Sequence, residues 1–351
     1  MANDRLNQKV GEHAVALQAQ RDINVGASIS EVMDVVAQSI QVYTEVARAH
    51  VNDRLAELEK KLTEKFSVGD PGAVKSLADP DVQGALYEAQ KAYVRSDDSE
   101  LHNVLTDLVY RRAVQERRDR IALAINDAIE KSSMLTRVDF ANLALIFFLG
   151  HVRLRGKLAP SLVAASLKQH LSPLLSDVDF SEDSMNYLYS RGVLLGPPSD
   201  TSYQAKSLAR RLVACYPEIY NEGFQLDEIE SFHPDVGKLL EYGILWRSPF
   251  SEGAHFIALS DDAIDELAER DQSLSGLREA YVAQAKKRLV RPEHVISETD
   301  KKFAGFSELC ANFDGSPMSL VGLSSTGIAI AHSYLVKEAS FSGDLKTWIR
   351  A

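Results

Sequence analysis

The sequence predicts a mainly α-helical protein with an N-terminal β-arm, a pair of long helices, a helical body and C-terminal winged-helix-like αβ units. Two features support this fold class. Apolar residues recur at helical spacing over residues 27–67, where neither glycine nor proline interrupts the pattern. Nearer the C-terminus, a helical pattern is followed by two short strand-like runs with a turn between them. We therefore expect four regions, which are residues 1–26, 27–135, 136–216 and 217–351.

The first region alternates apolar and polar side chains over residues 15–25, which is typical of a strand with one buried face. Its apolar positions include Val15, Leu17, Ile23 and Val25. A single ribbon buries too little surface to be stable in water. It therefore docks either as an edge strand on its own domain or against the arms of other copies, and the sequence leaves both alternatives open.

A long helix with one apolar stripe is predicted next. The stripe consists of Ile29, Val32, Val36, Ile40, Tyr43, Ala47, Val51, Leu55, Leu58, Leu62 and Phe66. Four of these residues (Ile29, Ile40, Val51 and Leu62) recur every 11 positions, which keeps the stripe nearly straight along the helix. Such a helix would be about 57 Å long and would extend beyond a small domain. Its partner is either the helical pattern of residues 98–135, as an antiparallel pair within the chain, or other copies in a parallel bundle.

The middle of the chain predicts shorter helices. Two Asp-Pro pairs and two glycines indicate a loop with about one helical turn over residues 67–81. The most apolar stretch, residues 138–150, indicates a buried helix that Thr136 caps with Asp139 as its capping-box partner. The remaining helices are expected at residues 81–95, 160–171, 181–190 and 205–216, with a sharp break at 196–200.

The C-terminal region predicts small αβ units. A helix that ends near Gly243 precedes the strand-like residues 244–248, a turn with Pro249 and Gly253, and the strand-like residues 255–259. A helix capped by Ser260 follows. This order resembles a winged-helix unit, and residues 316–335 repeat it more weakly.

Composition restricts the class of protein. The net charge is −11, from 39 basic and 50 acidic residues, which disfavours a surface that binds nucleic acid all over. The two cysteines, Cys215 and Cys310, cannot form a secretory disulfide framework and indicate a reducing compartment. The start of the chain has no secretory pattern, and residues 138–150 are too few to span a bilayer. We therefore expect a cytoplasmic protein without a membrane span.

No catalytic, cofactor-binding or metal-binding residue can be assigned from the sequence. The phosphate-binding, dinucleotide-binding, zinc-protease and nucleophile-elbow motifs are missing, and no two of the nine histidines lie within eight residues of each other. The carboxylate pairs at 97–98, 182–183 and 261–262 each lie at a predicted helix start, where acidic groups are favoured. They are therefore interpreted as helix caps.

Two basic runs stand out in the sequence. The arginines of residues 110–120 spread around a helix and are expected to form a solvated face with acidic partners from the other long helix, residues 27–67, rather than to bind phosphate. The second run contains Lys286, Lys287, Arg288 and Arg291, which would contact phosphate if the winged-helix-like unit binds nucleic acid. Such units also serve as protein-binding modules, so nucleic-acid contact is the less favoured alternative.

The N-terminus resembles a family signature. Gln8, Gly11, Gln18, Ala19, Asp22, Ile23 and Gly26 match a Q-x-x-G…Q-A-x-x-D-I-x-x-G segment of uncharacterised bacterial cytosolic proteins. The resemblance covers less than a tenth of the chain. Proteins with this segment often lie in mobile or phage-defence neighbourhoods, so the resemblance implies antiviral defence but no catalytic residue.

We therefore expect a non-enzymatic homo-oligomer that acts as a sensor or scaffold through contacts with a partner protein. Its oligomerisation residues would be Val15, Leu17, Ile23, Val25, Ile29, Ile40, Val51 and Leu62. The alternatives are a nucleic-acid-binding regulator that uses the C-terminal region and a hydrolase with an unrecognised site.

Overall fold

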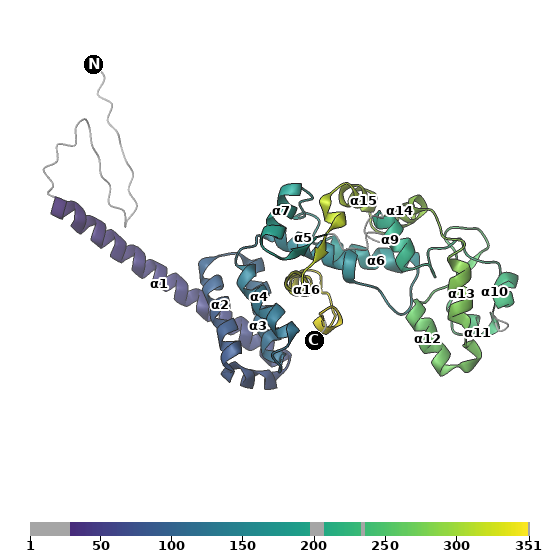
Figure 1. Cartoon of the computed structure of the whole chain (residues 1–351), viewed down its shortest axis with the longest axis horizontal. Coiled ribbons are helices and arrows are strands. Elements are labelled where there is room, and N and C mark those ends of the chain that lie inside the picture. Colours follow the sequence, from purple (N-terminus) through teal and green to yellow (C-terminus); the bar gives the residue numbers. More distant parts are fainter. Residues whose placement is uncertain (1–28, 197–206, 233–235, 350–351) are drawn as a thin grey trace, which may run out of the picture. The chain divides into compact units, whose positions relative to one another are not determined.

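The chain is mainly helical, as the sequence predicts (Figure 1). The computed structural model describes residues 29–196, 207–232 and 236–349. The predicted β-arm, with Val15, Leu17, Ile23 and Val25, lies outside the described residues. Two compact units are present, Met1–Arg54 and Leu55–Ala351. The four regions expected from the sequence have other boundaries and remain a prediction.

The first unit contains the beginning of helix α1, and the rest of that helix belongs to the second unit. Helix α1 comprises Ile29–Val68, in agreement with the predicted range. In the second unit, the helices that follow it are η1 (Pro71–Ala78), α2 (Pro80–Arg95), α3 (Ser99–Val114), α4 (Arg120–Ser132), α5 (Arg137–His151), α6 (Pro160–Leu171), α7 (Glu182–Ser190) and α9 (Leu208–Cys215). The later helices are α10 (Leu226–Phe232), α11 (Val236–Glu241), α12 (Asp261–Arg270), η2 (Gln272–Leu274), α13 (Leu277–Ala285), α14 (Pro292–Asp300), α15 (Phe306–Asp314), η3 (Pro317–Leu320), α16 (Ser325–Glu338) and η4 (Leu345–Thr347).

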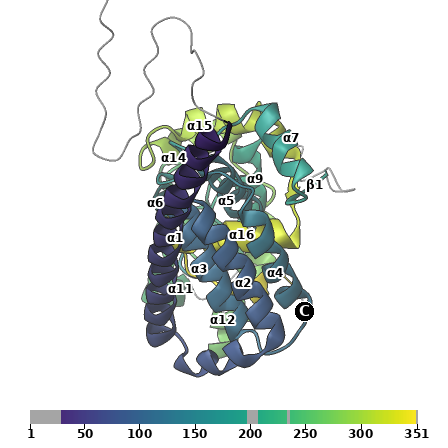
Figure 2. The same cartoon turned by 90° about the vertical axis from the view of Figure 1, so that its left-hand side faces the viewer.

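Helices α2, α3 and α4 lie side by side and pack against one another (Figure 1 and Figure 2). The C-terminal helix α16 packs against α3, α4 and α5, so the end of the chain completes the same hydrophobic core. Helix α5 supplies the buried residues Phe140–Phe148, which confirms the expected buried helix. Its Thr136–Asp139 capping box is also present.

The predicted single helix over residues 98–135 is wrong, because the chain leaves the helical conformation at residues 115–119. The Asp119 carboxylate accepts hydrogen bonds from the backbone N–H groups of Ile121 and Ala122, both at 3.0 Å. These bonds satisfy donors that a new helix start leaves unpaired, so α4 begins here without any glycine or proline.

Two small antiparallel sheets are present among the described residues. Strands β2 (Leu245–Arg247) and β3 (His255–Ile257) pair with Trp246 opposite Phe256, where the sequence predicts two strands and a turn. Strand β4 (Gly322–Leu323) pairs with β1 (Leu194–Leu195) instead of forming a local hairpin. The second winged-helix-like unit expected at 316–335 is therefore wrong. Its strand β4 pairs outside the segment, and residues 325–338 form the single helix α16.

Two hydrophobic clusters form the core of the second unit. The larger cluster extends from Leu58 to Ile349, and the smaller one comprises residues from Phe224 to Ala285 around β2 and β3. Within the part of the chain that the structure describes, no helix combines the length and hydrophobicity that crossing a membrane requires.

Candidate functional site

The side chains that the structure describes over residues 41–50 of α1 are exposed. Residues 41 and 43–50 are all exposed, including the large apolar side chains of Tyr43, at 73%, and Val46, at 50%. Isolated helices are only marginally stable in water because most helix stability in proteins comes from packing of an apolar face. The exposed apolar residues of this segment are therefore a candidate assembly surface.

The second half of α1 is different, because its stripe contributes to the core of the same chain. Leu58, Leu62 and Phe66 are buried, and Leu62 is only 8% exposed. This corrects the expectation that another copy is needed to bury Leu62. Val51 is half-buried, whereas the side chains of Ile29 and Ile40 lie outside the described residues.

A groove of about 600 Å³ runs along this second half of α1. Helix α1 forms one wall, and η1 and α2 form the other. The lining residues are Leu55, Leu58, Glu59, Leu62, Thr63, Phe66, Ser67, Pro71, Val74, Leu77, Leu86 and Gln90. Most of these side chains are apolar, and Val74 on the far wall is 48% exposed. The far wall was not predicted from the sequence, although the spacing of Val74 and Leu77 in the predicted loop is typical of one helical face.

Contacts between α1 and α3 hold this groove in shape. Lys65 Nζ lies 2.6 Å from Asp107 Oδ1, and the Phe66 and Tyr110 rings meet edge to face with centroids 5.4 Å apart. Burial acts to raise the pKa of Asp107, but the Arg111 and Lys65 charges outweigh it and hold that pKa below its ordinary value. The Asp107 carboxylate therefore stays ionised between the two helices.

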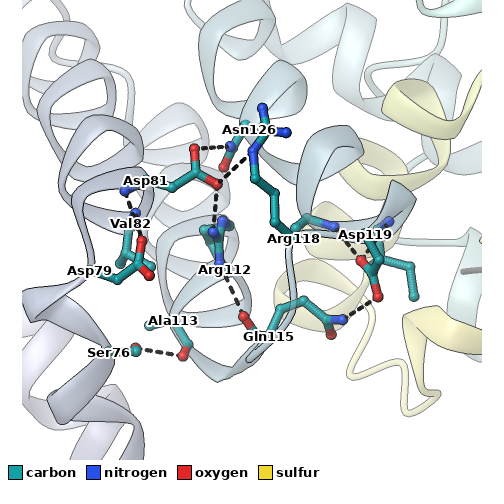
Figure 3. Close-up of polar contacts among 12 residues, drawn as sticks. Ser76, Asp79, Asp81, Val82, Arg112, Ala113, Gln115, Arg118, Asp119 and Asn126 are labelled. Carbon is teal, nitrogen blue, oxygen red and sulfur yellow. Dashed lines mark hydrogen bonds and ion pairs between the residues drawn. The ribbon is translucent and has the colours of Figure 1, made fainter.

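The first basic run forms a polar cluster between α2, α3 and α4 (Figure 3). Arg112 is buried, and its Nη2 donates to Asp81 Oδ2 at 2.7 Å. Asn126 Nδ2 donates to Asp81 Oδ1 at 3.2 Å. Arg118 Nε lies 3.7 Å from Asp81 Oδ2, the oxygen that Arg112 also contacts. The Arg112 hydrogen bond is the largest cause that lowers the pKa of Asp81. The acidic partner therefore lies on α2 and not on the expected long helix α1, and the burial of Arg112 corrects the expectation of a solvated face. The cluster instead joins α2, α3 and α4.

The second basic run lies on the surface beyond α13. The side chains of Lys286, Lys287, Arg288 and Arg291 are all exposed. Arg288 forms two hydrogen bonds with the Glu228 carboxylate, at 2.5 and 3.0 Å, and lies over the Phe224 ring. Because its guanidinium already pairs with the Glu228 carboxylate, Arg288 is the member of this run least suited to bind phosphate. Contact between these residues and nucleic acid remains a prediction.

Glu218 is a buried acid that no feature of the sequence predicts. Its side chain is 1% exposed, and its Oε1 atom has no hydrogen-bond partner. Burial raises the pKa of Glu218 to about 7, and the nearby charges of Asp261 and Asp262 add to this effect. Pro217 precedes Glu218 in the sequence, and no sequence pattern marks the site.

The buried histidines have structural contacts. His102 stacks on Tyr93 with ring centroids 3.5 Å apart, and its Nε2 lies 2.9 Å from the Ser96 carbonyl oxygen. His332 Nε2 lies 2.8 Å from the Gly343 carbonyl oxygen, and burial lowers its pKa to about 4. Among the described residues, no group of three or more His, Cys, Asp or Glu side chains is arranged to hold a metal ion.

Comparison with known proteins places the chain in a family. A family model whose description reads “:-like” matches residues 26–349. The chain belongs to that family. Among curated proteins and solved structures, no match was found.

Proposed function

We propose that this protein is a homo-oligomeric scaffold or sensor without enzymatic activity, assembled through the first half of α1. The exposure of Tyr43 and Val46 on that helix is the observation that carries the proposal. A helix that exposes such residues is stabilised when a partner covers them. The β-arm of residues 1–26 would add strand pairing between copies, as its alternating sequence predicts.

The solution mass of the full chain tests this proposal. We expect light scattering to give a multiple of the 38.8 kDa chain. The double variant Tyr43→Asp/Val46→Asp should have a smaller mass, because assembly would then bury two new charges. The matched control is Glu45→Gln, which lies on the same exposed segment and removes a charge without adding one. A monomeric full chain would disprove the proposal.

A role in antiviral defence is supported only by the resemblance of residues 8–26 to bacterial proteins from phage-defence neighbourhoods. If the role is right, cells that express the chain should resist some phages in plaque assays, and the Tyr43→Asp/Val46→Asp variant should lose that protection. Equal protection by both proteins would separate defence from assembly.

A nucleic-acid-binding regulator is the second candidate. Helices α10 and α11 followed by the β2–β3 hairpin have the order of a winged-helix-like unit, and the exposed Lys286 and Lys287 lie nearby in sequence. We expect Lys286→Glu/Lys287→Glu to abolish duplex DNA binding at low salt, where phosphate contacts are strongest. Absence of binding by the unaltered chain at low salt would exclude this candidate.

A further inference from the structure

We infer that the groove between α1, η1 and α2 is the acceptor for the first half of α1 from a second copy, in antiparallel orientation. This inference rests on the proposed function and names the contact that builds the oligomer. The donor segment is residues 43–51, and the acceptor comprises the groove residues from Leu55 to Gln90. Two-fold symmetry would make each copy both donor and acceptor.

The apolar spacing of α1 fits this occupant. Donor residues Tyr43, Ala47 and Val51 are separated by four positions, and the groove wall continues the same stripe with Leu55, Leu58, Leu62 and Phe66. One antiparallel register places Tyr43 between Leu62 and Phe66, Ala47 between Leu58 and Leu62, and Val51 between Leu55 and Leu58. Because Leu58, Leu62 and Phe66 are largely buried in their own chain, the donor side chains would contact only those surfaces of these residues that line the groove.

Charge complementarity supports the same register. Arg48 lies next to Val51 along one edge of the donor stripe, and Glu59 lies between Leu55 and Leu62 on the groove wall. The register places Arg48 of one copy opposite Glu59 of the other. A parallel arrangement in register would instead place Arg48 near Arg48 of the other copy and Glu59 near Glu59 of the other copy, so that like charges meet. The antiparallel arrangement therefore pairs opposite charges at both ends of the contact.

The far wall of the groove presents partly exposed apolar side chains to an incoming helix. They are Val74, which is half exposed, and the half-buried Leu77 and Leu86. An apolar groove with one acidic residue matches an amphipathic helix with one basic residue at its edge, which is a common mode of helix recognition. The Tyr43 ring would supply a large apolar anchor of the kind that is enriched at protein interfaces.

Charge reversal and rescue provide the first test on the full chain. We expect Arg48→Glu and Glu59→Arg each to raise the Kd of self-association by about fivefold, as measured by sedimentation equilibrium. The mixture of the two single variants should associate more tightly than either variant alone. Weakening without rescue in the mixture would overturn the register.

The groove wall provides the second test. Val74→Asp should raise the Kd by about 100-fold, because a charge would be buried in an apolar contact. The matched control is Tyr87→Asp on α2, where the side chain is 64% exposed and does not line the groove. If Tyr43→Asp/Val46→Asp dissociates the oligomer while Val74→Asp leaves it intact, the groove inference fails and the proposed function stands. If the unaltered chain is a monomer, both fail.

Cysteine cross-linking tests the orientation. Chains that carry Arg48→Cys, mixed with chains that carry Glu59→Cys, should form a disulfide-linked dimer under mild oxidation. Chains with Arg48→Cys alone should not cross-link above the background that Cys215 and Cys310 give in the unaltered protein. Efficient cross-linking of Arg48→Cys to itself would show a parallel bundle and overturn the inference.

Discussion

Lys65 in the last turn of α1 lies 2.6 Å from Asp107, a buried residue of α3. Arg111 Nε donates to the other oxygen of the same carboxylate at 2.5 Å. A single buried acid thus joins α1 to α3 and keeps two basic side chains in place. The joint lies next to Phe66, so it also fixes one wall of the groove along α1.

We expect Asp107→Asn to lower the free energy of unfolding at neutral pH by about 2 kcal/mol, because two basic side chains lose their shared partner. The pKa of Asp107 is lower in the folded chain than its ordinary value of 3.8. Its stabilising effect is therefore complete above that ordinary value and is lost as the pH falls through the folded pKa. Urea unfolding across acidic pH should show a weaker pH dependence in the variant. Glu64→Gln, which changes an exposed acid of α1, should leave the curve unchanged.

Arg112 and Arg118 offer a matched comparison, because both contact Asp81 from positions of different exposure. Arg112→Gln should lower the free energy of unfolding by about 2 kcal/mol, since the buried Arg112 connects α3 to α2. Arg118→Gln should lower the free energy of unfolding by less than about 0.5 kcal/mol, because the Arg118 side chain is largely exposed and water screens its ion pair with Asp81. Chemical denaturation measures both changes. If both variants lost the same free energy of unfolding, the burial of Arg112 would not explain its contribution to stability.

Local signals in the sequence predicted many of the helix boundaries. Thr136 and Ser260 are caps in the structure, and the predicted helices at 81–95 and 160–171 each agree with the structure within one residue. The strand pair at 244–248 and 255–259 was also visible, because the turn between its strands contains Pro249 and Gly253. These features depend on residues that are close in sequence.

The features that escaped prediction depend on distant residues. The break between α3 and α4 contains no glycine or proline, and a cluster that includes Asp81 of α2 lies beside it. The pairing of Leu194 with Leu323 joins positions far apart in the chain. The groove likewise requires α1 to meet η1 and α2. No periodicity within one segment encodes such contacts, so the candidate site could be predicted only on its α1 side.

Gly327 near the start of α16 should resist substitution by alanine. A Cβ atom there would lie 2.2 Å from the backbone oxygen of Val193. Since backbone atoms cannot move aside cheaply, we expect Gly327→Ala to lower the free energy of unfolding by at least about 2 kcal/mol. Gly150→Ala in α5 is the control, because a Cβ at Gly150 meets nothing within 4 Å. That change should be neutral or stabilise by up to about 1 kcal/mol. A similar loss in both variants, measured by thermal unfolding, would argue against the close approach.

Glu218 should make the protein less stable as the pH rises from acidic toward neutral. Burial raises the pKa of Glu218 in the folded chain from an ordinary value of 4.5 to about 7. Below the ordinary value, both folded and unfolded chains hold the proton. Between the two values, the unfolded chain releases its proton while the folded chain keeps it, so stability falls by up to about 3 kcal/mol. Glu218→Gln keeps a neutral side chain of similar size and should remove this loss. Urea unfolding at about pH 5 and about pH 8 measures the difference, and Glu222→Gln on the exposed Glu222 serves as the control. A variant that loses the same stability over this range as the unaltered chain would show that Glu218 ionises normally in the fold.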